Sequence, residues 1–204
     1  MRTGFDFSEL SEQEVYRLLA ATVVPRPIAW VTTTSVDGVD NLAPYSMFAL
    51  TSVDPPIVQF TSIGRKDTLR NIEANGEFVI NMASEPLIEH VNASSVDFPA
   101  NVSEFDALGL SREISAQVRP PRVAASPVAL ECRLHEVLYL GACTVVMGRV
   151  VHAAFREDVV VDGHPEAQRM RPLSRFGKNE WGVLPDLVGI DRIRLENWTG
   201  HNNA

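Results

Sequence analysis

The chain has 204 residues and a formal net charge of −8, and 45% of its residues are hydrophobic and 22% charged. This composition is ordinary for a soluble globular chain with a sizeable core. The acidic balance argues against general binding to nucleic acid or to an anionic membrane, since both carry negative charge. No apolar run is long enough to span a membrane. The two cysteines, Cys132 and Cys143, lack the spacing and density of a secreted disulfide framework, so we expect reduced thiols in a cytoplasmic protein.

The first half of the chain predicts a helix followed by closely spaced strands. Ser11 and Glu14 fit a capping box before an amphipathic run, which indicates a helix packed on the core. Residues 24–34 are rich in β-branched and aromatic side chains, and Asp37-Gly38 marks a tight turn before a second strand over 39–50. Further strands are expected at 57–62 and 77–82, and helices at 67–75, closed by Gly76, and at 85–93.

The second half begins with an irregular excursion and ends in a long hairpin. Residues 94–110 mix Pro, Asp, Asn and Ser, with one short helix expected after Ser103. Strands are expected at 128–140 and 143–155, with a short piece at 159–163. We predict a single domain over 1–204, with a core at about 20–180 on which the N-terminal helix and the C-terminal extension pack. The class is mainly β with short helices, and hairpin signals favour an antiparallel barrel.

Sequence-local catalytic and metal motifs are missing. The chain contains no GxGxxG, Walker A, HExxH or GxSxG pattern. None of its histidines belongs to a recognised metal-binding motif; they are His90, His135, His152, His164 and His201. We therefore expect no metal site.

The stretch TSIGRKDTLRNI, residues 61–72, concentrates positive charge in an acidic chain. A helix beginning near Asp67 presents free backbone N–H groups and the positive end of its dipole. Arg65 and Lys66 precede it, and Ser62 and Thr68 add hydroxyls. Together these groups form a phosphate socket, with Asp67 expected as the N-cap. The alternative is a solvated basic pair before an ordinary helix, and these residues alone do not separate the two interpretations.

An ordered set of segments extends this picture. PRPIAWVTT, NLAPYSMF, DPPIVQFTS, RKDTLRNI, GEFVINM, NASSVDFP, RVAASPVALEC and RPLSRFG follow one another over about residues 20 to 180. This succession resembles the flavin reductase-like family with the FMN-binding split-barrel fold. The resemblance implies a homodimer of six-stranded antiparallel split barrels of Greek-key type that binds FMN at the subunit interface.

The resemblance also implies positions for the cofactor. Ser62, Arg65, Lys66, Asp67 and Thr68 match the phosphate-binding loop, in agreement with the helix-end argument. The N-x-A-P-x-S pattern, which lines the flavin ring, is present as Asn41, Ala43, Pro44 and Ser46; its alternative is a strand with a Pro-induced bulge. Asn81 resembles a position that approaches the flavin, although a sheet-edge amide is nearly as good an interpretation. Arg26 and Arg175 are further candidates for the same groove, or else exposed arginines.

Two aromatic residues and one loop receive separate interpretations. Trp181 stands where many relatives have a tyrosine after PLxRxG, so the cover of the substrate face differs here. We assign Trp30 to the barrel core, because alternation directs one strand face inward. The segment from Phe98 to Phe105 is a candidate lid that excludes water from the flavin.

The function implied is hydride transfer from NADH or NADPH to FMN. The flavin supplies the chemistry, so no catalytic side chain is expected. The reduced flavin would pass to a monooxygenase or another redox partner. Two alternatives stay open: a flavoredoxin-like electron carrier with tightly bound FMN, and a non-catalytic FMN-binding module.

Overall fold

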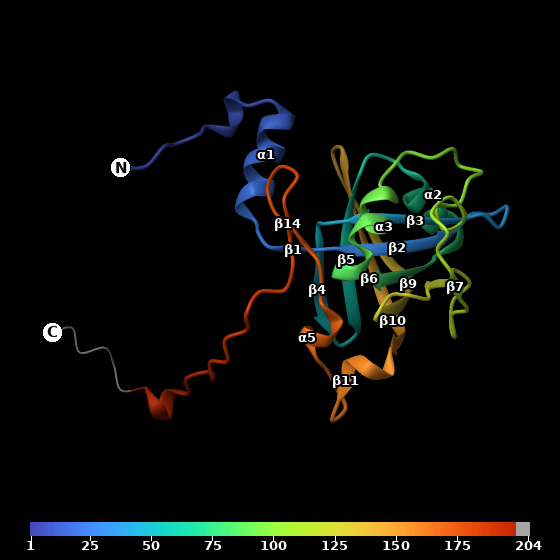
Figure 1. Cartoon of the computed structure of the whole chain (residues 1–204). Helices are drawn as coiled ribbons and strands as arrows, with labels where there is room; N and C mark the ends of the chain where they lie inside the picture. Colours follow the sequence, from blue (N-terminus) through green and yellow to red (C-terminus); the bar gives the residue numbers. More distant parts are fainter. Residues whose placement is uncertain (199–204) are drawn as a thin grey trace.

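The structure is a computed structural model that describes residues 1–198, and a single antiparallel sheet forms its body (Figure 1). Seven strands pair in the order β3-β2-β6-β9-β10-β5-β4. They are β2 Ala29–Thr34, β3 Asp40–Tyr45, β4 Phe48–Val53, β5 Pro56–Ile63, β6 Glu77–Met82, β9 Val128–Leu140 and β10 Cys143–Phe155. The sheet therefore has one strand more than the six expected.

Short elements surround this sheet. The helices are α1 Glu12–Thr22, α2 Asp67–Asn75, α3 Ile88–Ala93, α4 Glu104–Ala107 and α5 Ala167–Met170, with 3-10 turns at Phe7–Glu9, Glu85–Leu87, Glu157–Val159 and Leu195–Asn197. The short strands are β1 Arg26–Pro27, β7 Arg112–Glu113, β8 Arg122–Val123, β11 Val160–Val161, β12 His164–Pro165, β13 Ser174–Arg175 and β14 Trp181–Gly182. Strands β1, β13 and β14 form a small sheet of their own beside α1 (Figure 1).

The second predicted strand, 39–50, is two strands at opposite edges of the sheet. After β3 the chain crosses at Ser46 and Met47 and enters β4, which pairs with β5. The backbone N–H of Thr61 in β5 donates to the carbonyl of Met47 at 2.9 Å. This crossing brings the two sheet edges together and closes the barrel. The apolar sequence of residues 39–50 runs on without a turn signal, so it does not reveal the crossing.

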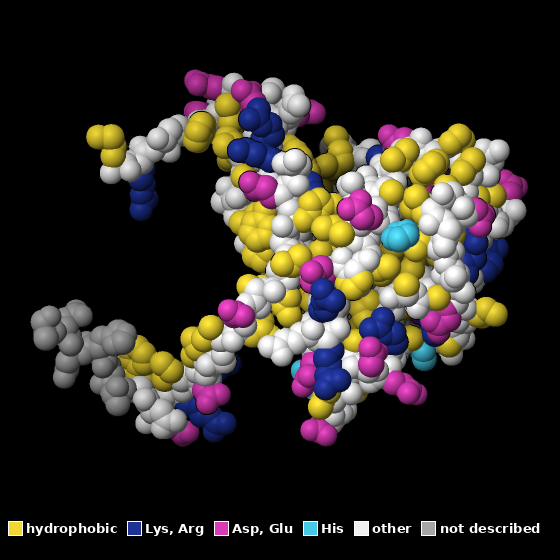
Figure 2. Space-filling model, in the orientation of Figure 1, with side chains coloured by type: hydrophobic (Ala, Val, Ile, Leu, Met, Phe, Trp, Pro, Cys, Tyr) yellow, Lys and Arg dark blue, Asp and Glu magenta, His cyan; other side chains and the backbone are white. Residues whose placement is uncertain are grey.

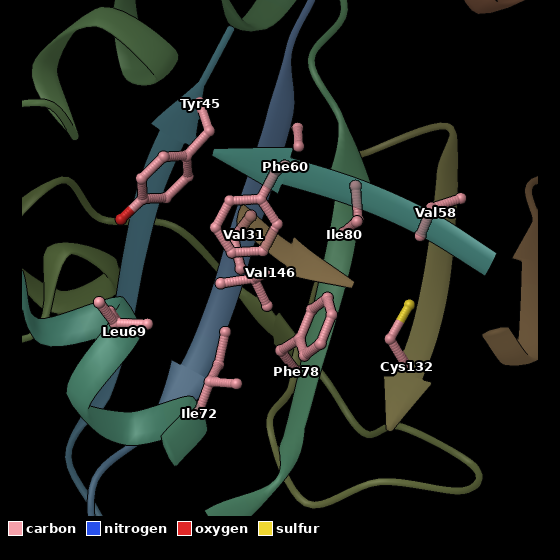
Figure 3. Close-up of a cluster of buried hydrophobic side chains, with 11 residues drawn as sticks. Val31, Tyr45, Val58, Phe60, Leu69, Ile72, Phe78, Ile80, Cys132 and Val146 are labelled. Atoms are coloured by element: carbon pink, nitrogen blue, oxygen red, sulfur yellow. The ribbon is translucent and has the colours of Figure 1, made fainter. Parts of the chain in front are cut away.

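The barrel interior is a dry aromatic and aliphatic cluster (Figure 3). Phe60 is fully buried, with its ring centroid 4.7 Å from that of Tyr45 and 5.8 Å from that of Phe78. Leu69 and Ile72, one turn apart on α2, pack into the same cluster. Because α2 buries this face, its N-terminal end is held at a fixed place on the barrel rim.

Trp30 is buried as predicted, but it lies outside the barrel interior. Its neighbour Val31 points into the barrel, whereas Trp30 joins a second cluster with Leu87, Val91 and Phe105. Alternation along β2 produces this division, since successive side chains face opposite sides of the sheet. The indole N–H donates to Ser94 Oγ at 2.8 Å, which anchors the beginning of the 94–110 excursion.

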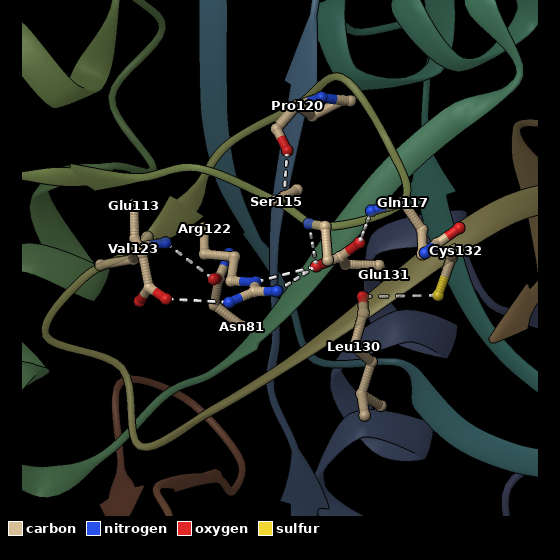
Figure 4. A network of polar contacts seen from close by, with 11 residues as sticks. Asn81, Glu113, Ser115, Gln117, Pro120, Arg122, Val123, Leu130, Glu131 and Cys132 are labelled. Carbon is tan, nitrogen blue, oxygen red and sulfur yellow. Dashed lines mark hydrogen bonds and ion pairs between the residues drawn. The ribbon is translucent and has the colours of Figure 1, made fainter. Parts of the chain in front are cut away.

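A polar network fixes residues 112–123 to the sheet (Figure 4). Glu131 is fully buried and accepts hydrogen bonds from the backbone of Ala116 and Gln117 and from the guanidinium of Arg122. Arg122 also bonds Glu113 at 2.8 Å. Burial raises the pKa of Glu131, but these donors together outweigh it, so the pKa lies below that of an ordinary glutamate.

The two terminal regions are more exposed than the sequence predicts. The capping box of α1 is present, with Ser11 and Glu14 bonded to each other's backbone, yet α1 has no buried residue and Leu19 is 46% exposed. Residues 185–198 are all exposed, and they extend away from the barrel (Figure 1). Hydrophobic side chains are visible along both regions (Figure 2). The predicted packing of these regions on the core is therefore absent along residues 185–198 and loose along α1.

Candidate functional site

A cavity of about 420 Å³ opens between β3, the start of α2 and the segment 94–98. It collects most of the residues that the sequence predicts for cofactor binding. The predicted residues that line it are Asn41, Ala43, Pro44, Ser46, Arg65, Lys66, Asp67 and Thr68. The two predicted motifs, far apart in sequence, thus face one space.

The N-terminus of α2 forms one wall of this cavity. Lys66 is the N-cap and Asp67 the first helical residue, so the expectation that Asp67 is the N-cap is wrong by one position. No side chain caps this end, which leaves its backbone N–H groups available to an anion. Thr68 is buried, and its Oγ1 accepts a hydrogen bond from Asn41 Nδ2 at 2.8 Å, which joins β3 to the helix.

The cations at this wall are exposed and paired with carboxylates. Arg65 bonds Glu73, and Lys66 bonds Asp97 at 3.0 Å across the mouth of the cavity. Arg70 bonds Asp67 within the helix. Exposed pairs of this kind are weak, so a phosphate can compete with these carboxylates for the same cations.

Tyr45 presents a buried hydroxyl without a partner. The residue is only 8% exposed, and its ring packs on Phe60 while its hydroxyl points to the margin of the cluster (Figure 3). Among the residues described, no group forms a hydrogen bond with this oxygen. Burial raises the pKa of Tyr45, so the hydroxyl keeps its proton. The hydroxyls of Thr68 and Ser62 are close enough to lower its pKa by a smaller amount. A spare donor thus lies directly behind the cavity wall, covered by neighbouring protein atoms.

A second hollow of about 290 Å³ continues the first and shares Tyr16, Pro44, Ser46 and Ser95 with it. At its far side the guanidinium of Arg175 lies over the ring of Trp181, 4.6 Å from the centroid. Burial lowers the pKa of Arg175, and Arg26 nearby adds to this shift. The groove therefore carries cations at both ends, and its far end adds the aromatic ring of Trp181.

Comparison with known proteins identifies the family. The family model described as flavin reductase like domain matches residues 21–168. The chain belongs to the flavin reductase-like family. An uncharacterized protein of Halalkalibacterium halodurans is 39% identical to it over 195 residues, which cover 90% of this chain and 93% of that protein.

Solved structures agree with this assignment. Nitrilotriacetate monooxygenase component B from Bacillus cereus is 30% identical, with a TM-score of 0.90 over 93% of this chain and 99% of that chain. The 2-nitrobenzoate 2-nitroreductase of Pseudomonas fluorescens is also 30% identical, with a TM-score of 0.90 over 97% of this chain and 100% of that chain. A split-barrel protein from Shewanella frigidimarina, with a TM-score of 0.82 at 20% identity over 93% of this chain and 100% of that chain, shows the fold. The predicted split-barrel class is confirmed, and membership of the family supports a flavin cofactor and a flavin-related redox function.

Three predicted residues of this flavin reductase-like protein lie outside the groove. Asn81 is fully buried on β6, between β2 and β9, where its amide bonds the carbonyl of Trp30, Thr32 Oγ1 and the N–H of Val123. It is therefore neither a flavin ligand in this arrangement nor an edge amide. Both N–H groups of its amide are used within the protein and its oxygen already accepts one hydrogen bond, which a sequence pattern cannot disclose.

The other two, Ser62 and Arg26, order the structure around the groove. Ser62 is buried, and its hydroxyl donates to the carbonyl of Gly64 at 3.1 Å, which shapes the loop before α2. Arg26 is also buried, and it donates to the carbonyls of Ala20 and Phe176. It joins the end of α1 to the hairpin that carries Arg175, and it lines a separate hollow under α1.

The candidate lid divides into two parts. Residues 94–98 line the cavity, and Phe98 is half-buried there. Phe105 is fully buried in the second cluster, with the guanidinium of Arg112 4.8 Å from its ring centroid. Arg112 also bonds Asp40 and Asp106, so this part of the excursion is fixed to β3. Only the part near Phe98 has the position that the lid hypothesis requires.

The sequence reasoning missed Tyr45 and Glu104, which also line the cavity. Tyr45 stands at the variable position of the N-x-A-P-x-S pattern, and Glu104 directly follows Ser103 in the irregular excursion. A buried acid at the start of a short helix leaves no local sequence signal when its partner is the backbone of a distant strand. Among residues 1–198, no group of three or more His, Cys, Asp or Glu is arranged to hold a metal. In the same part of the chain, no helix has the length and apolarity needed to cross a bilayer.

Proposed function

We propose that this protein is an NAD(P)H-dependent flavin reductase that binds FMN and transfers hydride to it from the nicotinamide. The observation that carries the proposal is the shared cavity of the α2 N-terminus, the Arg65 and Lys66 pair and the unpartnered hydroxyl of Tyr45. These groups fit a terminal phosphate monoester, since they offer backbone N–H groups and exposed cations, with a spare hydroxyl donor directly behind the wall. FMN ends in such a group, which favours it over FAD.

Each part of the groove has a role in this proposal. The flavin, when bound, accepts the hydride and passes the electrons on. The start of α2 holds the phosphate, while Ala43, Pro44 and Ser46 line the space between the phosphate end and Arg175. The planar guanidinium of Arg175 and the indole of Trp181 form a flat wall against which an aromatic ring can stack. Positioning is thus the protein's contribution, which agrees with the absence of a catalytic motif.

We further propose a homodimer with the flavin near the interface. Tyr16 on α1 lines both parts of the groove and is 49% exposed, and α1 also exposes Leu19. A second copy covering α1 would bury these side chains and shield the groove. Light scattering of the purified protein should give twice the mass of one chain, and a mass of one chain would remove this part of the proposal.

The electron acceptor is proposed by analogy alone. One similar structure is named as a monooxygenase component and another as a nitroreductase, so a separate monooxygenase or a small aromatic acceptor is the partner class. Both Cys132 and Cys143 are free thiols, in keeping with the proposed cytoplasmic location.

The test is an anaerobic titration of the FMN-loaded protein. After removal of unbound flavin, NADH and then NADPH are added, and the visible flavin band is followed. Bleaching by either nucleotide supports the reductase and identifies its donor. A band that persists with both nucleotides contradicts nicotinamide dependence, and a colourless protein after loading contradicts FMN binding.

A further inference from the structure

Glu104 is a buried acid in the wall of the proposed phosphate cavity. It is the first residue of α4, it is 6% exposed, and its side chain lines the cavity together with Asn41, Asp67 and Thr68. One carboxyl oxygen, Oε2, accepts a hydrogen bond from the backbone N–H of Leu42 at 2.8 Å. Strand β3 is the last strand on its side of the sheet, so one of its edges has no neighbouring strand in the sheet order. The bond to Glu104 gives the Leu42 N–H on β3 an acceptor.

No cation neutralises this acid. None of the ion pairs found among residues 1–198 includes Glu104; Arg65 and Lys66 are paired with Glu73 and Asp97 on the surface. Arg112, the cation nearest in sequence, bonds Asp40 and Asp106. A buried carboxylate without a cation is costly, and protonation removes that cost.

The groups that face Glu104 are an acid and a neutral hydroxyl, and neither supplies positive charge. Asp67 at the start of α2 and the hydroxyl of Tyr45 on β3 lie within its electrostatic reach. Burial raises the pKa of Glu104 most. The backbone N–H groups of Leu42 and of Glu104 itself lower it by smaller amounts, and the charge of Asp67 adds a still smaller increase, so the pKa stays above that of an ordinary glutamate. Asp97 lies at the rim on the other side of the cavity, bonded to Lys66. A phosphate in this cavity therefore meets an acid that already holds its proton more tightly than an ordinary glutamate.

We propose that Glu104 binds the ligand's phosphate as a neutral carboxylic acid, so that the cavity takes up one proton together with a phosphate monoester. The inference rests on the proposed function, because it assumes that the phosphate of FMN occupies this cavity. One proton from solvent adds to Oε1, and the resulting O–H donates to a phosphate oxygen. Oε2 keeps its bond to Leu42, so the fold is unchanged.

The sign of the linkage follows from this arrangement. A dianion beside Glu104 raises its pKa further, so the complex binds more protons than the free protein. Affinity for FMN then falls as the pH rises above the pKa of Glu104 in the free protein, with a limit of tenfold per pH unit. The phosphate itself works in the opposite direction, since its dianion forms near pH 6, at a second pKa of about 6.

The experiment measures FMN and riboflavin affinity by flavin fluorescence between about pH 4 and about pH 9, a range that begins below the ordinary carboxyl pKa and extends well above it. The proteins are the full wild-type chain, Glu104→Gln and Asp106→Asn. The amide of Glu104→Gln keeps an acceptor for Leu42 and never ionises. Asp106→Asn changes the same charge on the same helix, at an exposed side chain outside the cavity. Riboflavin lacks the phosphate, so it isolates the proposed contact.

The wild type and Asp106→Asn should lose FMN affinity at high pH relative to Glu104→Gln, by about tenfold or more at the upper end of the range. Riboflavin should show no such difference. Well above about pH 6, where the phosphate is already a dianion, calorimetry in two buffers of different ionisation enthalpy should detect proton uptake when the wild type binds FMN and none with Glu104→Gln. This second readout needs only the wild type if the variant fails to fold.

Equal pH profiles for FMN in the wild type and Glu104→Gln, or no proton uptake by the wild type, would overturn the inference while leaving FMN binding intact. The same difference for riboflavin would also overturn it, because the phosphate would play no part. No FMN binding by the wild type at any pH would instead remove the proposed function, and the inference with it.

Discussion

The protein contains two buried polar regions that differ in how their hydrogen bonds are satisfied. Around Glu131, backbone amides and Arg122 supply donors to both carboxyl oxygens, and the pKa of the acid is lowered (Figure 4). In the cavity at the start of α2, Glu104 has a raised pKa and the hydroxyl of Tyr45 has no partner among the residues described.

Burial alone therefore does not identify a functional site. Both acids are more than nine-tenths buried, but only the cavity holds groups whose hydrogen-bonding capacity exceeds what its neighbours supply. The Glu131 region should govern stability without affecting the flavin, and the cavity should govern flavin affinity with little effect on stability. Each variant below tests one side of that division.

The largest effect is expected from Glu131→Gln. Removing one charge of a buried pair leaves Arg122 with only the exposed Glu113, which should lower the free energy of unfolding by about 3 kcal/mol. Urea denaturation measures this change. Glu113→Gln is the matched control and should cost less than about 1 kcal/mol. A change in FMN affinity without a loss of stability would break the comparison.

The charge reversal Arg65→Glu with Lys66→Glu should come next. Both side chains are exposed, so the fold should be retained, while FMN affinity should fall by at least about a hundredfold because the phosphate loses two cations. Equilibrium dialysis measures the retained flavin. The control is Arg133→Glu with Arg149→Glu, the same charge change on exposed strand positions away from the cavity. Normal flavin content in the first variant would mean that the phosphate binds elsewhere.

Tyr45→Phe should have a smaller effect on the same affinity. The hydroxyl has no internal hydrogen bond to lose, so thermal stability should stay the same or rise slightly. FMN affinity should fall by about tenfold, the loss of one hydrogen bond to a charged group. Tyr139→Phe removes an exposed hydroxyl bonded to Glu73 and serves as the control. An unstable Tyr45→Phe would show that the hydroxyl has a structural partner after all.

The smallest effect is expected on how the stability of the ligand-free protein changes with pH. Because the pKa of Glu104 is raised in the folded protein, its contribution to stability is present below the unfolded pKa and is lost as the pH rises through the folded pKa. Glu104→Gln should therefore gain stability relative to the wild type as the pH increases. Glu131 should behave in the opposite way, with its contribution lost as the pH falls through its lowered pKa. Melting curves across the pH range would reveal both trends, and parallel curves would refute them.

The sequence predicted the elements with strong local signals. The capping box of α1 and the bounds of α2, which ends at Gly76 with a φ of 70°, follow from rules that involve neighbouring residues. The prediction of a phosphate loop rests on the same kind of signal, since charge and helix start are adjacent in the chain. The resemblance then united this loop with the Asn41 to Ser46 segment, and the structure places both on one cavity.

The missed features depend on pairings between distant residues. The split of 39–50 into β3 and β4 requires knowledge of which strand each half joins. Asn81 looked like a ligand because an amide among apolar residues needs hydrogen-bond partners. Its partners are in fact Val123, Trp30 and Thr32, which lie elsewhere in the chain. Glu104 was missed for the same reason, since its partner Leu42 lies 62 residues away.

The crossing at Ser46 and Met47 has one more consequence. It is where the two free edges of the sheet approach each other, and the cavity lies directly over it, lined by Pro44, Ser46, Met47 and Thr61. A molecule bound there touches both sides of this seam and opposes its opening. Amide hydrogens at the ends of β3 and β5 should therefore exchange more slowly in the flavin-bound protein than in the flavin-free protein.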